Sequence, residues 1–247
     1  MAIIPGRGSI RTALSTLTGI YGFVSYAARP SSSWRVDAMV EIGTKRLVSW
    51  PTFRLDFMAE PAYTVRALDE STWTAFAALV ERNNGIFGGC WCMGFHDDDS
   101  RTDPARNRSA KERRVREGRA HAALVYEGDD CVGWCQFGAP GEVPRIKSRA
   151  AYEKGRTTSP DWRIACCYAG KGHRRRGVAT AALAGALDLI AGLGGGTVEG
   201  YPEGADAVPA GFLFNGALST YEKLGFIRDR KIGKHRWVVT RVVEPRS

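Results

Sequence analysis

The fold is decided by the stretch Trp162 to Leu193, which has the sequence WRIACCYAGKGHRRRGVATAALAGALDLIAGL. Its first part, Trp162 to Tyr168, is rich in apolar and β-favouring residues and predicts a buried strand. Small residues and glycines from Ala169 to Gly172 predict a turn. Apolar residues then recur with helical spacing, which predicts a helix that begins near Gly177 and packs one face on a sheet. The run of glycines at 194–196 predicts its end.

The junction between this turn and the helix is strongly basic and contains small residues. A glycine lets the backbone approach a ligand closely, and the free N–H groups at a helix N-terminus bind anions such as phosphate. A solvated basic turn that caps the helix is the alternative. The residues concerned are Arg174, Arg175, Arg176, Gly177, Val178 and Ala179.

Two segments carry a resemblance to a known family. The pattern Arg174-x-x-Gly177-x-Ala179 resembles the (Gln/Arg)-x-x-Gly-x-(Gly/Ala) acetyl-CoA motif of the GNAT superfamily of N-acetyltransferases. The later segment Asn215 to Phe226, NGALSTYEKLGF, resembles the Asn-(six residues)-Tyr-Glu-Lys-x-Gly-Phe helix and turn of the same family. The resemblance covers Tyr63 to Val243.

The resemblance implies an α/β fold of the GNAT type, in which helices flank a mixed central sheet with two splayed parallel strands. Here these strands correspond to Trp162 to Tyr168 and Thr197 to Pro202. It further implies that acetyl-CoA is the acyl donor, without a metal, and that its pantetheine arm bonds to backbone groups near Ala169 and Lys171. Asn215 matches a position that contacts CoA, and helix capping is the competing role.

The implied activity is transfer of an acetyl group to an amine, of a small molecule or of a protein. Tyr221 matches a tyrosine that protonates the departing thiolate, with a packing role as the alternative. Glu199 is the predicted base, and His96 or an ordered water are the other candidates. Arg163 stands where histone-type members have a glutamate, which argues against their mechanism. An inactive acyl-CoA-binding module and a nucleic-acid-binding protein are the competing functions.

Composition limits the partners. The 247 residues include 35 Lys and Arg against 26 Asp and Glu, a net charge of +9 that favours acidic ligands such as CoA. The sequence has no nucleic-acid recognition motif and no apolar run long enough for a membrane span, so neither partner is predicted. A homodimer is left open.

The cysteines do not suggest a disulfide framework. Most of the six fall in predicted strands or in an apolar loop of a sizeable chain, so we expect reduced thiols and a cytoplasmic protein. Cys90, Cys92 and His96 raise the question of a metal site. No second pair of ligands follows at suitable spacing, so no metal is predicted.

The chain is predicted to consist of an extension, residues 1–57, and a catalytic domain, residues 58–247. The extension has no acidic residue before Asp37. A signal peptide and a transit peptide are weak alternatives to an upstream segment that is disordered or weakly structured. Met58 is the predicted native start.

The remaining patterns predict the outer elements. Ser71 is expected to cap a helix that ends near Arg82. The segment 141–156 is a basic excursion that could reach over the active site or lie in solvent. Further predicted elements are a strand at 63–68, a helix at 103–118, a hairpin of strands 120–127 and 131–137, a helix at 212–224 and a strand at 237–243.

Overall fold

The computed structural model describes residues 63–86, 88–97, 103–204 and 213–246, together with the backbone of four strands nearer the N-terminus. The chain divides into two compact units, Met1–Ala62 and Tyr63–Ser247. The expected domain boundary before Met58 falls outside the described residues.

The first unit contains an antiparallel sheet with the strand order β1-β2-β3-β4. The strands are Arg11–Ser15, Tyr21–Ala27, Arg35–Glu41 and Leu47–Ser49. The sequence predicted disorder or weak local structure here. β2 has the sequence YGFVSYA, whose aromatic and β-branched residues favour a strand.

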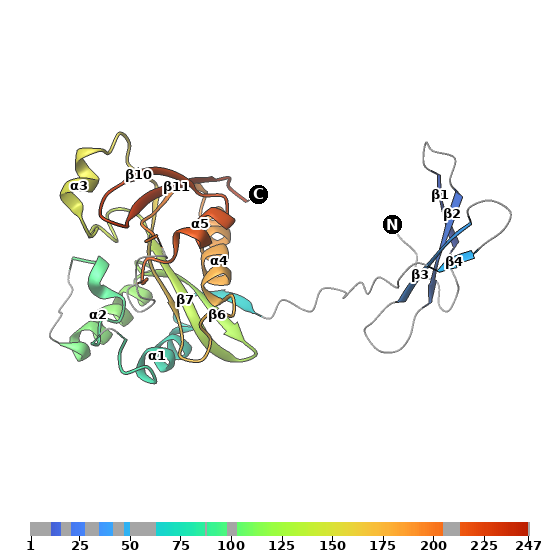
Figure 1. The fold of residues 1–247 in the computed structure, drawn as a ribbon. Coiled ribbons are helices and arrows are strands. Elements are labelled where there is room, and N and C mark those ends of the chain that lie inside the picture. The colour runs from blue at the N-terminus through green and yellow to red at the C-terminus, as the bar shows by residue number, and fades with distance from the viewer. Residues whose placement is uncertain are drawn as a thin grey trace. The chain divides into compact units, whose positions relative to one another are not determined.

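The second unit is built on a seven-stranded sheet with the order β10-β11-β9-β8-β7-β6-β5 (Figure 1). Neighbouring strands are antiparallel except β8 and β9, which are parallel. This is the mixed sheet that the sequence predicted. The strands are β5 (Thr64–Ala67), β6 (His121–Glu127), β7 (Asp130–Gly138), β8 (Trp162–Ala169), β9 (Gly196–Gly200), β10 (Ile227–Lys231) and β11 (Trp237–Val243).

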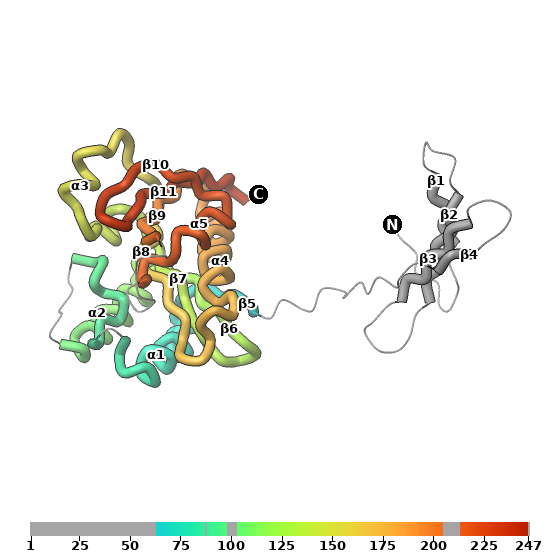
Figure 2. Tube along the Cα trace, viewed as in Figure 1, coloured from blue at the N-terminus to red at the C-terminus, as the bar shows by residue number. Residues whose placement is uncertain are grey.

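Helices flank this sheet. α4 packs against β6, β7 and β8 and contacts α5, and the tube in Figure 2 follows the chain from β8 through α4 to β9. α1 contacts β7, and its apolar residues belong to a second core that includes η2 and α2 residues. The helices are α1 (Trp73–Glu81), η2 (Met93–Phe95), α2 (Pro104–Arg116), α3 (Arg149–Lys154), α4 (Val178–Gly192) and α5 (Leu218–Lys223).

The predicted core helix is confirmed as α4. Leu183, Ala186 and Ile190 are fully buried, as the helical spacing of apolar residues required. The glycines that follow adopt the left-handed backbone region, with φ of 103° at Gly194, so the helix ends there.

Three details differ from the sequence-based expectations. The N-cap of α1 is Thr72, whereas the hydroxyl of Ser71 donates to the Asp69 carboxylate at 2.6 Å. The predicted helix at 212–224 is shorter, because Gly216 has a φ of 85° that no right-handed helix accommodates. The strand β10 was not predicted, because its sequence IRDRK is mostly exposed and charged.

We expect a chain that begins at Met58 to keep the melting temperature and acetyl-CoA affinity of the full chain. The reason is that the second unit contains its own sheet and both of its large apolar cores. Thermal unfolding and calorimetric titration of both chains check this. A marked fall in melting temperature would show that residues 1–57 belong to the catalytic core.

Candidate active site

A cleft lies where β8 ends and α4 begins. It has a volume of about 280 Å³. The loop between the two elements turns sharply, with positive φ angles at Gly172, Arg175 and Gly177. The lining residues are Cys167, Tyr168, Ala169, His173, Arg174, Arg175, Gly177, Val178, Ala179, Thr180, Leu213, Phe214, Gly216, Ala217 and Thr220.

The N-terminus of α4 forms one wall of this cleft. Gly177 is the N-cap residue, with a φ of 88°, and no side chain caps the helix. The first hydrogen bond of the helix runs from the Ala181 N–H to the Gly177 carbonyl. The N–H groups of Val178, Ala179 and Thr180 precede it and therefore have no partner within the helix. Such a terminus suits a phosphate.

The structure divides the three consecutive arginines. Arg174 and Arg175 line the cleft. The guanidinium of Arg176 instead donates to the Glu127 carboxylate at 2.7 Å. The backbone carbonyl of Arg176 accepts from the Tyr63 hydroxyl. Lys171 also lies outside the described lining. Two of the predicted phosphate-binding side chains therefore face the cleft, and Arg176 is held in a surface ion pair.

The parallel strands β8 and β9 separate soon after they start. They pair only at Trp162 with Val198 and at Arg163 with Glu199. On the other side of β8, Ile164 and Cys166 pair with the consecutive residues Phe137 and Gln136, so Ala165 is an extra, bulged residue. A bulge bends its strand, which helps β8 diverge from β9.

The segment before α5 fills part of the gap between these strands. The Cys167 N–H donates to the Phe214 carbonyl at 2.7 Å, and the Asn215 side-chain amide donates to the Ala165 carbonyl at 2.6 Å. Asn215 is therefore bonded inside the protein and does not line the cleft, whereas Ala169 does. A pantetheine arm in this gap must compete with Phe214 for the Cys167 N–H.

Tyr221 lies behind the cleft and is fully buried. Its hydroxyl donates to the Asn215 carbonyl at 2.9 Å and lies beside the Cys167 thiol, which lines the cleft. Burial raises the pKa of Tyr221 well above its usual value, so the phenol stays protonated. Its ring packs on Gly200, where an added Cβ would lie 2.2 Å from the Tyr221 Cε1 atom. Gly200 is thus required for this packing.

Glu199 is held on the opposite face of β9. Its carboxylate accepts from the hydroxyls of Tyr152 at 2.9 Å and Tyr201 at 2.8 Å. Because consecutive residues of a strand point to opposite faces, Glu199 points away from the side on which Gly200 meets Tyr221. The structure therefore does not bring the two predicted catalytic side chains together, and their roles stay predictions.

His96, the alternative base, is buried in a chain of hydrogen bonds. Its Nδ1 lies 2.6 Å from the Glu142 carbonyl, and its Nε2 lies 3.0 Å from the Gln136 Nε2 atom. The Gln136 Oε1 atom accepts from the buried Lys111 ammonium at 3.2 Å. These contacts are all satisfied when Nδ1 donates and Nε2 accepts, so they favour the neutral imidazole.

The cysteines are free thiols, and all but Cys90 are buried. Cys92 accepts a hydrogen bond from the Trp134 indole at 3.2 Å. Within the part of the chain that the structure describes, no group of three or more His, Cys, Asp or Glu side chains is arranged to hold a metal ion.

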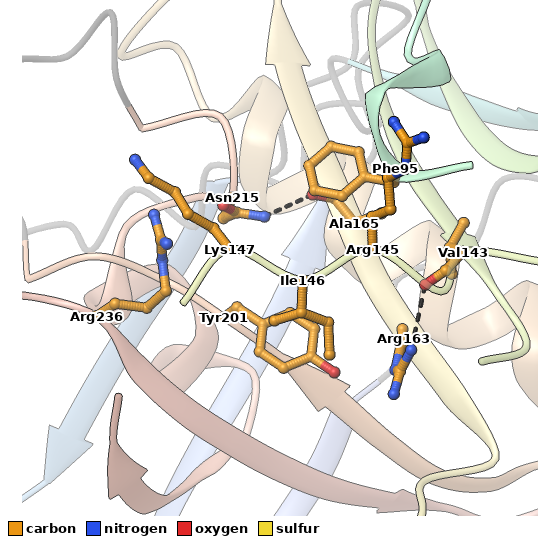
Figure 3. A pocket seen from close by; sticks show the side chains of 10 residues that line it. All are labelled: Phe95, Val143, Arg145, Ile146, Lys147, Arg163, Ala165, Tyr201, Asn215 and Arg236. Atoms are coloured by element: carbon orange, nitrogen blue, oxygen red, sulfur yellow. Dashed lines mark hydrogen bonds between the residues drawn. The ribbon is translucent and has the colours of Figure 1, made fainter. Parts of the chain in front are cut away.

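A second, smaller pocket is lined by Arg163 and Ala165 of β8 together with Arg145, Ile146 and Lys147 (Figure 3). The sequence did not predict this pocket, although the basic excursion at 141–156 supplies Arg145 and Lys147. The lining residues are Phe95, Val143, Arg145, Ile146, Lys147, Arg163, Ala165, Tyr201, Asn215 and Arg236.

Among the described residues, no helix is both long and apolar enough to pass through a membrane.

Residues 49–226 match the model of the acetyltransferase (GNAT) family. No curated protein matches the sequence.

Solved structures with a similar fold include the ribosomal-protein-S18-alanine N-acetyltransferase of Escherichia coli, with 11% identity and a TM-score of 0.42 over 75% of this chain and 96% of that chain. A Salmonella typhimurium protein described as an acetyltransferase, solved with its cofactor acetyl-CoA, has 16% identity and a TM-score of 0.45 over 75% and 96%. A mosquito arylalkylamine N-acetyltransferase-like protein has 13% identity and a TM-score of 0.45 over 73% and 99%.

Because the family model spans most of the chain, including β8, the basic loop and α5, the protein belongs to the acetyltransferase (GNAT) family.

Proposed function

We propose that this protein transfers the acetyl group of acetyl-CoA directly to an amine. The observation that carries the proposal is that neighbouring residues at the separation of β8 and β9 line two different pockets. Cys167 and Gly216 line the cleft at the start of α4, whereas Ala165 and Asn215, their near neighbours in sequence, line the second pocket. A donor and an acceptor bound on the two sides would meet at this point.

The donor side suits the phosphates of CoA. The free N–H groups at the start of α4 and the guanidinium groups of Arg174 and Arg175 would hold the pyrophosphate. Backbone groups of Ala169 would receive the pantetheine arm, which carries the acetyl thioester. Lys171, Arg176 and Asn215 are further proposed cofactor contacts. To reach the cofactor, Arg176 must leave Glu127, Asn215 must leave the Ala165 carbonyl, and Lys171 must turn into the cleft.

The acceptor amine attacks only when it is unprotonated, so a base must remove its proton. Glu199 is the proposed base. It would receive the proton through the hydroxyl of Tyr152 or Tyr201, each of which donates a hydrogen bond to its carboxylate. His96 and an ordered water are the alternatives. Tyr221 then donates its phenolic proton to the departing thiolate. Burial keeps the phenol protonated until that step, and its hydroxyl lies beside the thiol of Cys167, a residue that lines the cleft.

The proposed location is cytoplasmic, because the six cysteines are free thiols and acetyl-CoA is available there. Neither a nucleic acid nor a membrane is needed as a partner, and a homodimer is left open.

We expect acetyl-CoA to bind in a calorimetric titration and a panel of amines to release free CoA, which a thiol reagent detects. An enzyme without a metal should keep this activity after treatment with a chelator. Binding without turnover on every amine would instead support an inactive acyl-CoA-binding module. Salt-sensitive binding of DNA without any affinity for acetyl-CoA would support the nucleic-acid alternative.

A further inference from the structure

The second pocket is unusually cationic. Four of its ten described lining residues, Arg145, Lys147, Arg163 and Arg236, carry a positive charge, and none of the ten is acidic. Figure 3 shows Arg236 and Lys147 on one side of the pocket and Arg163 on the other, with Ile146 and Tyr201 between them. A pocket with this lining favours an anion.

Arg163 is the most informative of these residues. It is only 5% exposed, yet no carboxylate of the described residues forms an ion pair with it. Its terminal nitrogens donate to the carbonyls of Val143 at 3.3 Å and Pro140 at 3.5 Å and to the Tyr152 hydroxyl at 3.4 Å. Its Nε atom has no hydrogen-bond partner in the structure. A buried cation is costly unless it is paired and hydrogen-bonded, so this guanidinium is suited to an incoming anion.

Arg236 repeats this arrangement on the opposite side. It is 3% exposed, and its Nε atom has no hydrogen-bond partner among the described residues. One of its terminal nitrogens forms an ion pair with Glu203, which neutralises much of its charge. Arg236 can therefore contribute a hydrogen bond, and Arg163 contributes a charge that no carboxylate of the described residues contacts directly.

Glu199 offsets part of this charge, because it is the cross-strand partner of Arg163 where β8 and β9 pair. The two side chains are linked through Tyr152, whose hydroxyl accepts from Arg163 and donates to Glu199. The carboxylate of Glu199 also accepts from Tyr201. If Arg163 only links Val143 to Tyr152 by hydrogen bonds, the enzyme should show no preference for acceptors that carry a negative charge.

The position of the pocket relates it to the acceptor. Ala165 lies at the separation of the strands, two residues after Arg163, which corresponds to about 6–7 Å along a strand. An amine at the separation would thus have its neighbouring substituents near Arg163. The free volume of the pocket is about 10 Å³, which is room for roughly one polar atom, so only the end of a substituent fits without side-chain movement.

We propose that this pocket binds an anionic group of the acceptor, so that the substrate is a primary amine that carries a carboxylate or phosphate a few bonds away. The inference rests on the proposed acetyl transfer and adds the class of acceptor. Arginine suits such a group because its hydrogen bonds to an anionic oxygen are charge-assisted, and the free volume of the pocket admits one such oxygen.

The test compares acceptors that differ in charge: glycine with glycinamide, β-alanine with β-alaninamide, and O-phosphoethanolamine with ethanolamine. We expect kcat/KM to be about 10–100-fold higher for the anionic member, the range expected for charge-assisted hydrogen bonds. The amine of the amides is less basic and more often unprotonated near neutral pH, which works against the expected preference. The carboxylate and phosphate pairs show which anion the pocket prefers.

Arg163→Met should reduce this preference to within about threefold of unity, and Arg163→Lys should keep part of it, since it retains the charge without the planar fork. Arg228→Met is the matched control. Arg228 is exposed, pairs with Glu222 and lies outside both pockets, so its loss changes the net charge equally and should leave the preference intact.

Direct binding provides a readout in the wild-type protein. N-acetylglycine, a product analogue, should bind in the presence of CoA, and N-acetylglycinamide should bind at least about tenfold more weakly. Equal binding of the two, together with equal turnover of acids and amides, would overturn the anion pocket and leave acetyl transfer standing. Arg163-dependent binding of N-acetylglycine without turnover of any amine would support the pocket and contradict the proposed function.

Discussion

A Gly177→Val variant is expected to fold and to bind acetyl-CoA about 100-fold or more weakly than the wild type. Gly177 caps α4 with a φ of 88°, a conformation that a β-branched residue adopts only with strain. A valine there shifts the loop and covers the N–H groups that would face the pyrophosphate. Losing two charge-assisted hydrogen bonds, at about 1.5–3 kcal/mol each, gives a loss of this size.

Gly194→Val is the control for backbone strain. Gly194 has a φ of 103° at the other end of α4, and no atom lies within 4 Å of its added Cβ. Both substitutions therefore cost about 1–3 kcal/mol of folding free energy, but only the first alters the cleft. Calorimetry on both variants checks this. A folded Gly177→Val protein with wild-type affinity for acetyl-CoA would show that the loop is a basic cap and no phosphate site.

A Tyr221→Phe variant is expected to lose about 100-fold in kcat while KM for acetyl-CoA changes little. The phenol is the proposed proton donor to the thiolate, and general acids contribute about 10²–10⁴-fold. We expect the lower end, because a CoA thiolate leaves without much help. The variant also loses the hydrogen bond to the Asn215 carbonyl, which costs about 0.5–1.5 kcal/mol of stability.

A fall in kcat with little change in KM for acetyl-CoA indicates a general acid, whereas a residue that only packs in the core would not produce this pattern. Tyr126→Phe removes the same atom from a buried tyrosine of β6 that lines neither pocket, and it should leave kcat unchanged. Unchanged turnover in Tyr221→Phe would show that Tyr221 has only a packing role and that water is the proton source.

The central part of the fold was predictable because each of its signals is local. The apolar spacing of α4 and the glycines at both of its ends fix the helix, and the strand β8 before it follows from its apolar composition. The arginines beside Gly177 indicated an anion site for the same reason. In the structure, Arg174 and Arg175 line the cleft, and their role in binding phosphate stays a prediction.

The rest depends on contacts between distant segments. Asn215 was expected beside the cofactor, but its side chain bonds to Ala165 of β8, and its neighbour Phe214 bonds to Cys167, which only the tertiary structure shows. The second pocket likewise joins Arg163 of β8 to Arg236, far apart in sequence.

The opposite orientation of Glu199 and Tyr221 has a local signal in the sequence, which is Gly200. Gly200 follows Glu199 in β9 and is the residue against which the Tyr221 ring packs. The alternation of a strand then places Glu199 on the other face. A glycine within a strand often marks such a close approach.

The most direct test follows an isotope-labelled acetyl group from acetyl-CoA into product. We expect the label to appear in an amide of the acceptor amine, in an amount equal to the CoA released and dependent on Gly177. Label that stays on CoA with every amine tested, or that appears only as free acetate, would contradict direct transfer to an amine.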